Sequence, residues 1–151
     1  MQTEYQGSCH CGAIGFRYWT ATPPAEWSIR ACQCTFCRAH DALSTSDPAG
    51  QIEFFANQPE LLQRYRFGLK TADFHLCRQC GVYIGAEIET TRGLFGIVNL
   101  HALKEKLSTM AQVAPISYDD EDTRARSLRR EVRWSPVIRE GDSDPNSVKG
   151  Q

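Results

Sequence analysis

The chain has 151 residues, which is enough for one compact domain with a hydrophobic core and too few for two ordinary domains. Its 17 basic and 18 acidic side chains give a net charge of -1, so no overall field favours nucleic acid or a membrane surface as partner. Its apolar runs are far shorter than the roughly 18 residues that cross a bilayer. The first residues include an acid and lack an apolar stretch, so we expect no secretory signal and a reducing, cytoplasmic location.

Short strand-like stretches alternate with turns over the first hundred residues. Apolar and polar side chains alternate in several of these stretches, as they do in half-buried strands. We predict strands over residues 13–19, 26–31, 51–55, 61–67, 71–76, 82–89 and 94–100, and either a short edge strand or an ordered arm over residues 1–8. Thr35 is a plausible N-cap for a short helix that runs to residue 40. The predicted fold class is therefore mainly β, with short antiparallel strands and one or two short helices.

The last third of the chain carries weaker signals. The strand-rich part is expected to end near residue 100, with a short helix over residues 101–110 and one returning strand over residues 115–118. Residues 119–133 hold five acids and five arginines, with Leu128 and Val132 four positions apart, which predicts a surface helix held by ion pairs. The interleaved acids favour a solvated face over a nucleic-acid patch, so we assign this stretch no functional role.

The seven cysteines all fall into closely spaced clusters. These clusters are Cys9 with Cys11, then Cys32 with Cys34 and Cys37, and finally Cys77 with Cys80. An odd number leaves one thiol over in any complete disulfide framework, and disulfides are rare in a reducing compartment. Three clusters at metal-ligand spacing therefore predict zinc rather than disulfides or redox thiols. We expect residues 1–140 to form a single zinc-binding β domain, followed by a polar, flexible tail over residues 141–151.

Two divisions of the seven thiols between metal ions are possible. In the first, the three central cysteines hold one zinc ion and the other four hold a second as a closed tetrathiolate. In the alternative, the pairs Cys34/Cys37 and Cys77/Cys80 form a zinc ribbon and three thiols are left without a shared purpose. We favour the first, because three neighbouring thiols lose little loop-closure entropy on meeting one ion, while the closed site joins distant strands. The predicted cofactors are two zinc ions per chain, one structural and one open.

The three-cysteine site predicts chemistry with thiols. Three ligands leave one tetrahedral position open, and the net charge of about -1 makes such a zinc a weak activator of water. It suits the binding of an incoming thiol as thiolate, so the predicted ligand is a small thiol. Arg38 and His40 follow the cluster and are candidates for binding a carboxylate or moving a proton, although either could be a solvated helix residue. His40 could instead fill the open position, which would argue against catalysis.

The cysteine clusters and their flanking residues resemble a known family. Residues 7–13, 32–38, 65–68 and 76–81 look like the glutathione-dependent formaldehyde-activating enzyme family, which also includes centromere protein V. The resemblance covers roughly residues 5–100. It implies a zinc-centred β fold of the tent type. It also implies a structural zinc on Cys9, Cys11, Cys77 and Cys80, and a catalytic zinc on Cys32, Cys34 and Cys37.

The same resemblance implies an activity. The family adds glutathione to formaldehyde to give S-hydroxymethylglutathione, a reaction classed as carbon–sulfur lyase chemistry in the reverse sense. Thr35 stands where serine is common, and residues 39–42 replace a more basic, glycine-containing stretch, so the substrate does not follow from the cysteines. The expected partners are a small thiol such as glutathione and an aldehyde, with no nucleic acid and no membrane. The alternative function is a non-catalytic, zinc-stapled module that binds a thiol or another protein.

Overall fold

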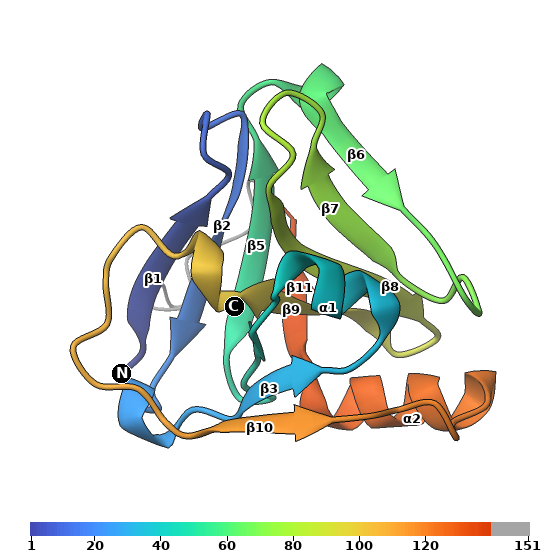
Figure 1. The fold of residues 1–151 in the computed structure, drawn as a ribbon. Coiled ribbons are helices and arrows are strands. Elements are labelled where there is room, and N and C mark those ends of the chain that lie inside the picture. The colour runs from blue at the N-terminus through green and yellow to red at the C-terminus, as the bar shows by residue number, and fades with distance from the viewer. Residues whose placement is uncertain (140–151) are drawn as a thin grey trace, which may run out of the picture.

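A computed structural model describes residues 1–139, so the expected tail over residues 141–151 lies outside the described residues. Strands dominate, which confirms the mainly β fold class (Figure 1). The strands are β1 (Thr3–Ser8), β2 (Ile14–Thr20), β3 (Ile29–Cys32), β4 (Ser44–Thr45), β5 (Gln51–Ala56), β6 (Leu62–Tyr65), β7 (Asp73–Cys77), β8 (Tyr83–Thr90), β9 (Gly93–Asn99), β10 (Val113–Ile116) and β11 (Ser135–Ile138). The helices are α1 (Thr35–His40) and α2 (Thr123–Arg133), with 3₁₀ turns η1 (Pro24–Glu26), η2 (Pro59–Leu61) and η3 (Leu100–Ala102).

Strand β9 is the branch point of the sheet. One of its edges pairs with β8, which continues through β7 to β6. Its other edge pairs first with β11 and then with β4. From β11 the sheet runs through β5 and β2 to β1, and from β4 it runs through β3 to β10. All pairs are antiparallel except β10 with β3 and β11 with β5, so the parallel pairs both involve strands that follow residue 100.

The expected end of the strand-rich part near residue 100 is wrong. β11 lies between β5 and β9, and β10 extends the sheet beyond β3. The helix expected over residues 101–110 is also absent, because only the single turn η3 forms there. The backbone then bonds to β1 instead: the N–H of Lys104 donates to the carbonyl oxygen of Gln6 at 2.9 Å, and Leu103 bridges Gly7.

Two clusters of buried side chains form the core. The first packs around β2, where Phe16 and Tyr18 are fully buried, and the ring of Trp27 meets Tyr18 edge-on at 5.5 Å. The second cluster surrounds Cys37 at the start of α1, and it includes Tyr83 and Trp134. The second cluster therefore gives the cysteines of α1 a rigid, apolar support.

Helix α2 confirms the predicted surface helix, and its buried side chain is an arginine. Leu128 and Val132 are 50% and 65% exposed, whereas Arg130 is only 7% exposed. The Arg130 guanidinium donates to the Thr71 hydroxyl at 2.6 Å and lies over the Trp134 ring. The apolar pair thus faces solvent, and an arginine face packs inward. None of the helices within residues 1–139 is long and apolar enough to span a membrane.

A buried ionic group pins β7 to β8 just before the turn that carries Cys77. The Glu87 carboxylate lies 3.0 Å from His75 Nε2 and accepts from Arg64 at 2.9 Å and Arg139 at 3.0 Å. Burial opposes the charge of Glu87, but the His75 hydrogen bond, the charges of His75 and Arg139 and the Arg64 hydrogen bond outweigh it and lower the Glu87 pKa to about 2.

Glu87→Gln is expected to lower the free energy of unfolding by about 3 kcal/mol near pH 7. Because the folded-state pKa of Glu87 is depressed, its stabilisation is fully present above the ordinary pKa of 4.5 and is lost as the pH falls towards 2. Urea unfolding at a series of pH values measures this as a gap between wild type and variant that narrows in acid. The exposed Glu89 lies on the same strand, so Glu89→Gln is the control and should show no such gap.

Candidate functional site

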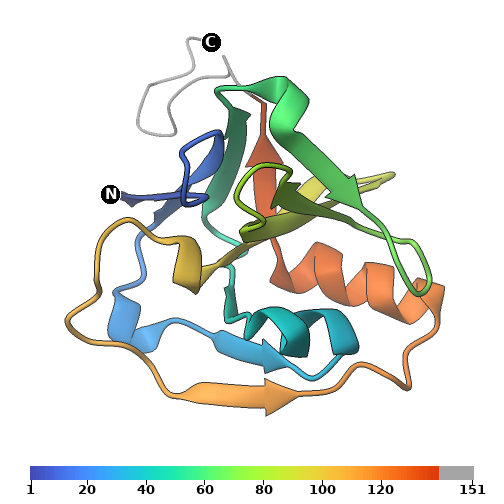
Figure 2. The ribbon, with the colours of Figure 1, turned by 45° about the horizontal axis from the view of Figure 1, so that its top comes forward.

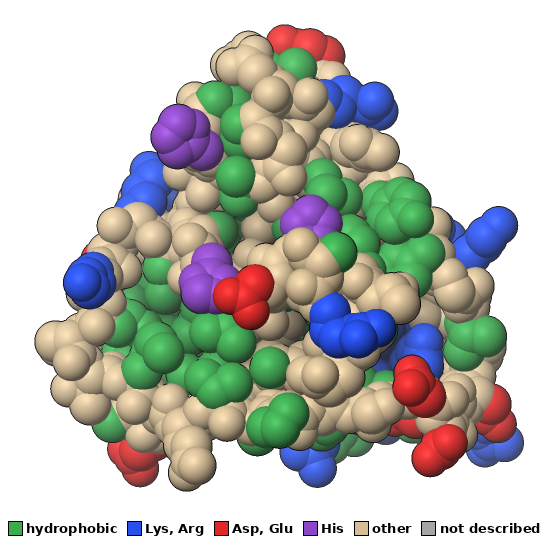
Figure 3. Space-filling view, viewed as in Figure 1, with side chains coloured by type: hydrophobic (Ala, Val, Ile, Leu, Met, Phe, Trp, Pro, Cys, Tyr) green, Lys and Arg blue, Asp and Glu red, His purple; other side chains and the backbone are tan. Residues whose placement is uncertain are grey.

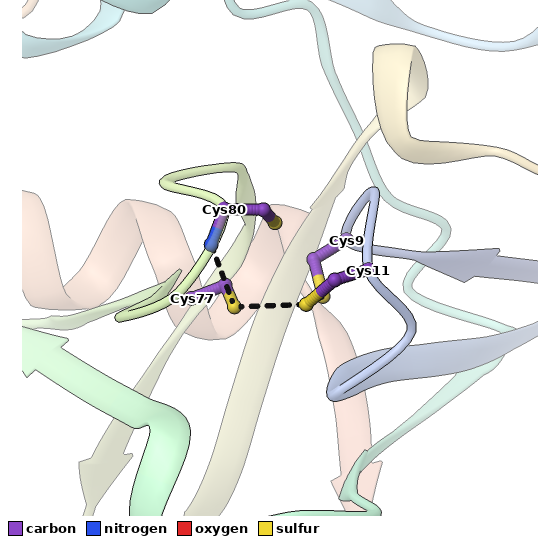
Figure 4. Close-up of side chains that lie close together, drawn as sticks. All are labelled: Cys9, Cys11, Cys77 and Cys80. Carbon is purple, nitrogen blue, oxygen red and sulfur yellow. Dashed lines mark hydrogen bonds between the residues drawn. The ribbon is translucent and has the colours of Figure 1, made fainter.

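Four cysteines from two distant loops come together at one point. Cys9 and Cys11 lie in the loop between β1 and β2, and Cys77 and Cys80 lie in the turn after β7 (Figure 4). Their sulfur atoms all lie within 4.8 Å of one another, with 3.7 Å between Cys9 and Cys11 and 3.5 Å between Cys11 and Cys77. Sulfurs at the corners of a tetrahedral zinc site with 2.3 Å bonds lie about 3.8 Å apart. This tetracysteine group therefore fits a single zinc ion.

Backbone geometry prepares both loops for anionic sulfur. The N–H of Ile14 lies 3.4 Å from the Cys9 sulfur, and the N–H of Cys80 lies 3.4 Å from the Cys77 sulfur. Each loop then turns through a left-handed glycine, Gly12 at φ 85° and Gly81 at φ 80°. Glycine adopts this conformation without the steric cost of a side chain, so the pattern of cysteine followed by glycine closes both loops in the same way.

The other three cysteines form a tricysteine cluster where β3 meets α1. Cys32 ends β3, Cys37 is buried in α1, and their sulfurs lie within 4.8 Å of each other and of Cys34. The N-cap of α1 is Cys34 and not Thr35 as expected, because the Cys34 sulfur accepts from the backbone N–H of Cys37 at 3.4 Å. One sulfur thus caps the helix and faces its two neighbours.

The three thiols of this cluster share negative charge unequally. Hydrogen bonds from Cys32 and Cys37 lower the pKa of Cys34 to about 2. Hydrogen bonds with Cys32 and Cys34 have the opposite effect on Cys37 and raise its pKa. One thiolate therefore forms easily and further ionisation is opposed by the charge already there. A divalent cation would remove that opposition, so the cluster has the chemistry of a soft metal site.

The grouping of the sulfurs matches the first of the two divisions considered from the sequence. Within residues 1–139, no group joins the Cys34/Cys37 pair to the Cys77/Cys80 pair, so the zinc-ribbon alternative is not formed. His40 belongs to neither group. Its ring packs against Phe36 at 4.5 Å and Tyr83 at 5.7 Å between centroids. Among the described residues, the tricysteine cluster therefore has three ligands, and the His40 ring packs against aromatic side chains instead.

A cavity of about 490 Å³ opens directly onto the tricysteine cluster. All three of its cysteines line this cavity, and none of the tetracysteine group does. The walls come from α1, from the loop between β6 and β7, and from α2 with the segment that leads into it. Figure 2 shows α1 and α2 near each other. The apolar part of the lining consists of Phe67, Leu69, Ala72, Phe74, Ile97 and Trp134. Arg38 also lines the cavity, whereas His40 does not.

One wall of the cavity is basic, and the sequence reasoning did not assign it. Basic side chains gather near the approach of α1 and α2, with acidic ones beside them (Figures 1 and 3). The charged lining consists of Arg30, Arg38, Arg126, Arg129, Arg130, Asp119 and Glu121. A signal was present in the spacing, because the three α2 arginines stand at i, i+3 and i+4 and must share one helix face. Burial, followed by the charges of Arg129 and Arg126, lowers the pKa of Arg130 to about 10.

Tyr83 is a second group that the sequence reasoning missed. Its hydroxyl is buried and has no hydrogen-bond partner within residues 1–139. Burial, and then the charges of Cys37, Cys32 and Cys34, raise its pKa well above 10. The hydroxyl therefore stays protonated, and Tyr83 lies in the same buried cluster as Cys37.

Comparisons with known proteins agree with this arrangement. The model of the family described as glutathione-dependent formaldehyde-activating enzyme matches residues 4–118. The fold is also similar to a crystal structure of a Rhodobacter sphaeroides protein from a structural genomics programme, with 26% sequence identity and a TM-score of 0.54. That match covers 71% of this chain and 99% of the other. The chain therefore belongs to the glutathione-dependent formaldehyde-activating enzyme family.

Proposed function

We propose that the protein is a zinc-dependent carbon–sulfur lyase-type enzyme that joins a small, glutathione-like thiol to formaldehyde or a related aldehyde. Each chain would hold two zinc ions, one structural on the tetracysteine group and one open on the tricysteine cluster. The proposal extends to a reducing, cytoplasmic setting, in which all seven cysteines stay available as ligands. Family membership supports the pairing of glutathione with formaldehyde.

The observation that carries the proposal is the unequal placement of the two cysteine groups. The tetracysteine group has a complete set of four ligands and lies apart from the cavity lining. The tricysteine cluster has three ligands and faces a cavity of a size that small-molecule sites commonly have. A closed site stabilises a fold, whereas an incomplete site on a cavity wall leaves room for a ligand.

The reaction needs a sulfur nucleophile held beside a carbonyl carbon. Zinc on the tricysteine cluster would supply an open, thiophilic position that favours the thiolate form of the substrate. The apolar lining, including Phe74 and Trp134, excludes water from the reacting atoms. The thiolate sulfur forms a bond to the aldehyde carbon while the carbonyl π bond breaks, and the oxygen takes the proton that the thiol released. Arg38 lines the cavity and stays a candidate for moving that proton or for binding a substrate carboxylate.

The test is the rate of S-hydroxymethylglutathione formation, followed by NMR in a mixture of glutathione and formaldehyde. The adduct also forms without a catalyst, so the rate with zinc-loaded protein must exceed the rate of the blank. We expect an acceleration that grows in proportion to protein concentration. A rate equal to the blank, with glutathione still bound, would favour the non-catalytic thiol-binding module instead.

A further inference from the structure

The basic wall of the cavity contains one buried guanidinium group, on Arg130, and one partly buried group, on Arg30, and neither has a carboxylate partner within residues 1–139. Arg130 bonds to the Thr71 hydroxyl, and its Nε is buried without any hydrogen-bond partner. Arg30 is partly buried on β3 and donates to the hydroxyls of Ser46 at 2.8 Å and Ser28 at 3.2 Å. A buried cation with only neutral partners is costly, because those partners do not replace the water that it loses.

Arg129 and Arg126 differ from these two in having a carboxylate partner, although the Nε of Arg126, like that of Arg130, is buried without a hydrogen-bond partner among the described residues. Glu121 accepts two hydrogen bonds from Arg129, at 2.8 Å and 3.0 Å, and lies 3.6 Å from Arg126 Nε. The Arg129 guanidinium also lies 3.5 Å from the centroid of the Tyr118 ring. Glu121 therefore pairs with Arg129 and Arg126, whereas Arg30 and Arg130 have no carboxylate partner within residues 1–139.

The charge balance of the cavity leaves room for an anionic ligand. Its lining holds five arginines and two carboxylates, an excess of three positive charges. Three thiolates on one divalent ion carry a net charge of -1, and an incoming thiolate adds one more negative charge. One positive charge then remains, which one carboxylate on the same ligand would neutralise. A guanidinium also offers a planar pair of donors that matches a carboxylate.

We propose that Arg130 and Arg30 are specificity-determining residues that select thiols bearing a carboxylate over neutral thiols. The inference rests on the proposed function, because it assumes that a thiol occupies the cavity. Arg30 lies within the residues that the family model matches, whereas Arg130 lies on α2, beyond the last matched residue. The ligand's sulfur would meet the tricysteine cluster while its carboxylate meets the basic wall.

Calorimetric titration of the zinc-loaded full chain with two matched thiols tests the inference. The probes are 3-mercaptopropionate and 3-mercaptopropionamide, which have the same length and differ in charge. We expect wild type to bind the carboxylate roughly tenfold more tightly, as hydrogen bonds to charged groups typically allow. Arg130→Gln and Arg30→Gln should each remove most of this preference and leave the affinity for the amide nearly unchanged. Arg124→Gln is the control, because Arg124 is exposed on the same helix and outside the cavity lining.

The outcomes separate this inference from the proposed function. Equal binding of both thiols by wild type, or a preference that survives in both glutamine variants, overturns the role of the two arginines and leaves the thiol site standing. Binding of neither thiol overturns the proposed function and the inference with it. If Arg130→Gln fails to fold, the Arg30→Gln variant decides, since Arg30 is tied only to serine side chains and a backbone carbonyl.

Discussion

Cys34→Ser is expected to lower the zinc content from two ions per chain to one and to abolish both thiol binding and any acceleration of adduct formation. Serine is a good N-cap residue, so its hydroxyl replaces the sulfur that accepts from the Cys37 N–H and helix α1 is kept. The same hydroxyl is a poor ligand for a soft metal ion. The change therefore removes metal chemistry from the cavity while it leaves the fold in place.

The measurements are zinc released on denaturation, thiol affinity by calorimetry and thermal unfolding. We expect the unfolding midpoint to fall by no more than about 4 °C, because the lost stabilisation is of the order of 1 kcal/mol in a chain of this size. Cys37→Ser should give the same loss of one ion and serves as an independent variant within the tricysteine cluster. Loss of both ions together with unfolding would contradict the division into a structural and an open site.

The cysteine clusters could be predicted from the sequence because their geometry is local. Spacings of two and three residues place sulfurs on one side of a turn, and a following glycine, as at Gly12 and Gly81, lets the turn close. Once seven thiols are divided between two ions, the four that lie far apart in sequence account for one another. The structure brings together the same two groups. Most strands of the first hundred residues were similarly predictable from their own alternating patterns, whereas the two-residue strand β4 was not predicted.

Helix α2 shows why the basic wall of the cavity was harder to predict from the sequence than the cysteine clusters. Leu128 and Val132 are both exposed, and the buried position belongs to Arg130. Which face is buried depends on partners distant in the chain, here Thr71 and Trp134, and no local pattern contains them. The five acids and five arginines of residues 119–133 cancel when charges are counted along the sequence. The fold, however, places three of these arginines on one wall of the cavity.

Strand β11 was missed for a related reason. A proline within a short apolar run normally argues against a central strand, because proline has no N–H for the ladder. In the structure the pairing of β11 is divided: Ser135 and Pro136 pair with β9, while Val137 and Ile138 pair with β5. Each half serves one neighbour, so Pro136 does not interrupt a ladder that runs along the whole strand. Such a division depends on tertiary structure, so the four residues of β11 carry no local sequence pattern that predicts it.

Cys77→Ser should strongly destabilise the fold as well as remove a zinc ion, whereas Cys34→Ser removes an ion and leaves the fold in place. Cys77 is 2% exposed, ends β7, and lies 3.5 Å from the sulfur of Cys11, which is 66 residues earlier in the chain. Its sulfur also accepts from the backbone N–H groups of Gln79 and Cys80, each at 3.4 Å. One ligand therefore holds together the β1–β2 loop, the end of β7 and the turn that follows it.

The expected magnitude comes from comparing two free energies. Structural zinc contributes roughly 10–16 kcal/mol in small zinc-dependent domains, which matches or exceeds the whole stability of about 5–15 kcal/mol of an ordinary domain. This chain also has two apolar core clusters, so part of the fold can survive without this zinc ion. Even so, we expect the unfolding midpoint of Cys77→Ser to fall by about 10 °C or more.

Thermal unfolding followed by circular dichroism measures this fall in the midpoint. His10→Ala is the control, since His10 is exposed between Cys9 and Cys11 and belongs to neither group. A Cys77→Ser protein that melts like the control and keeps both ions would show that the tetracysteine group does not hold the fold together.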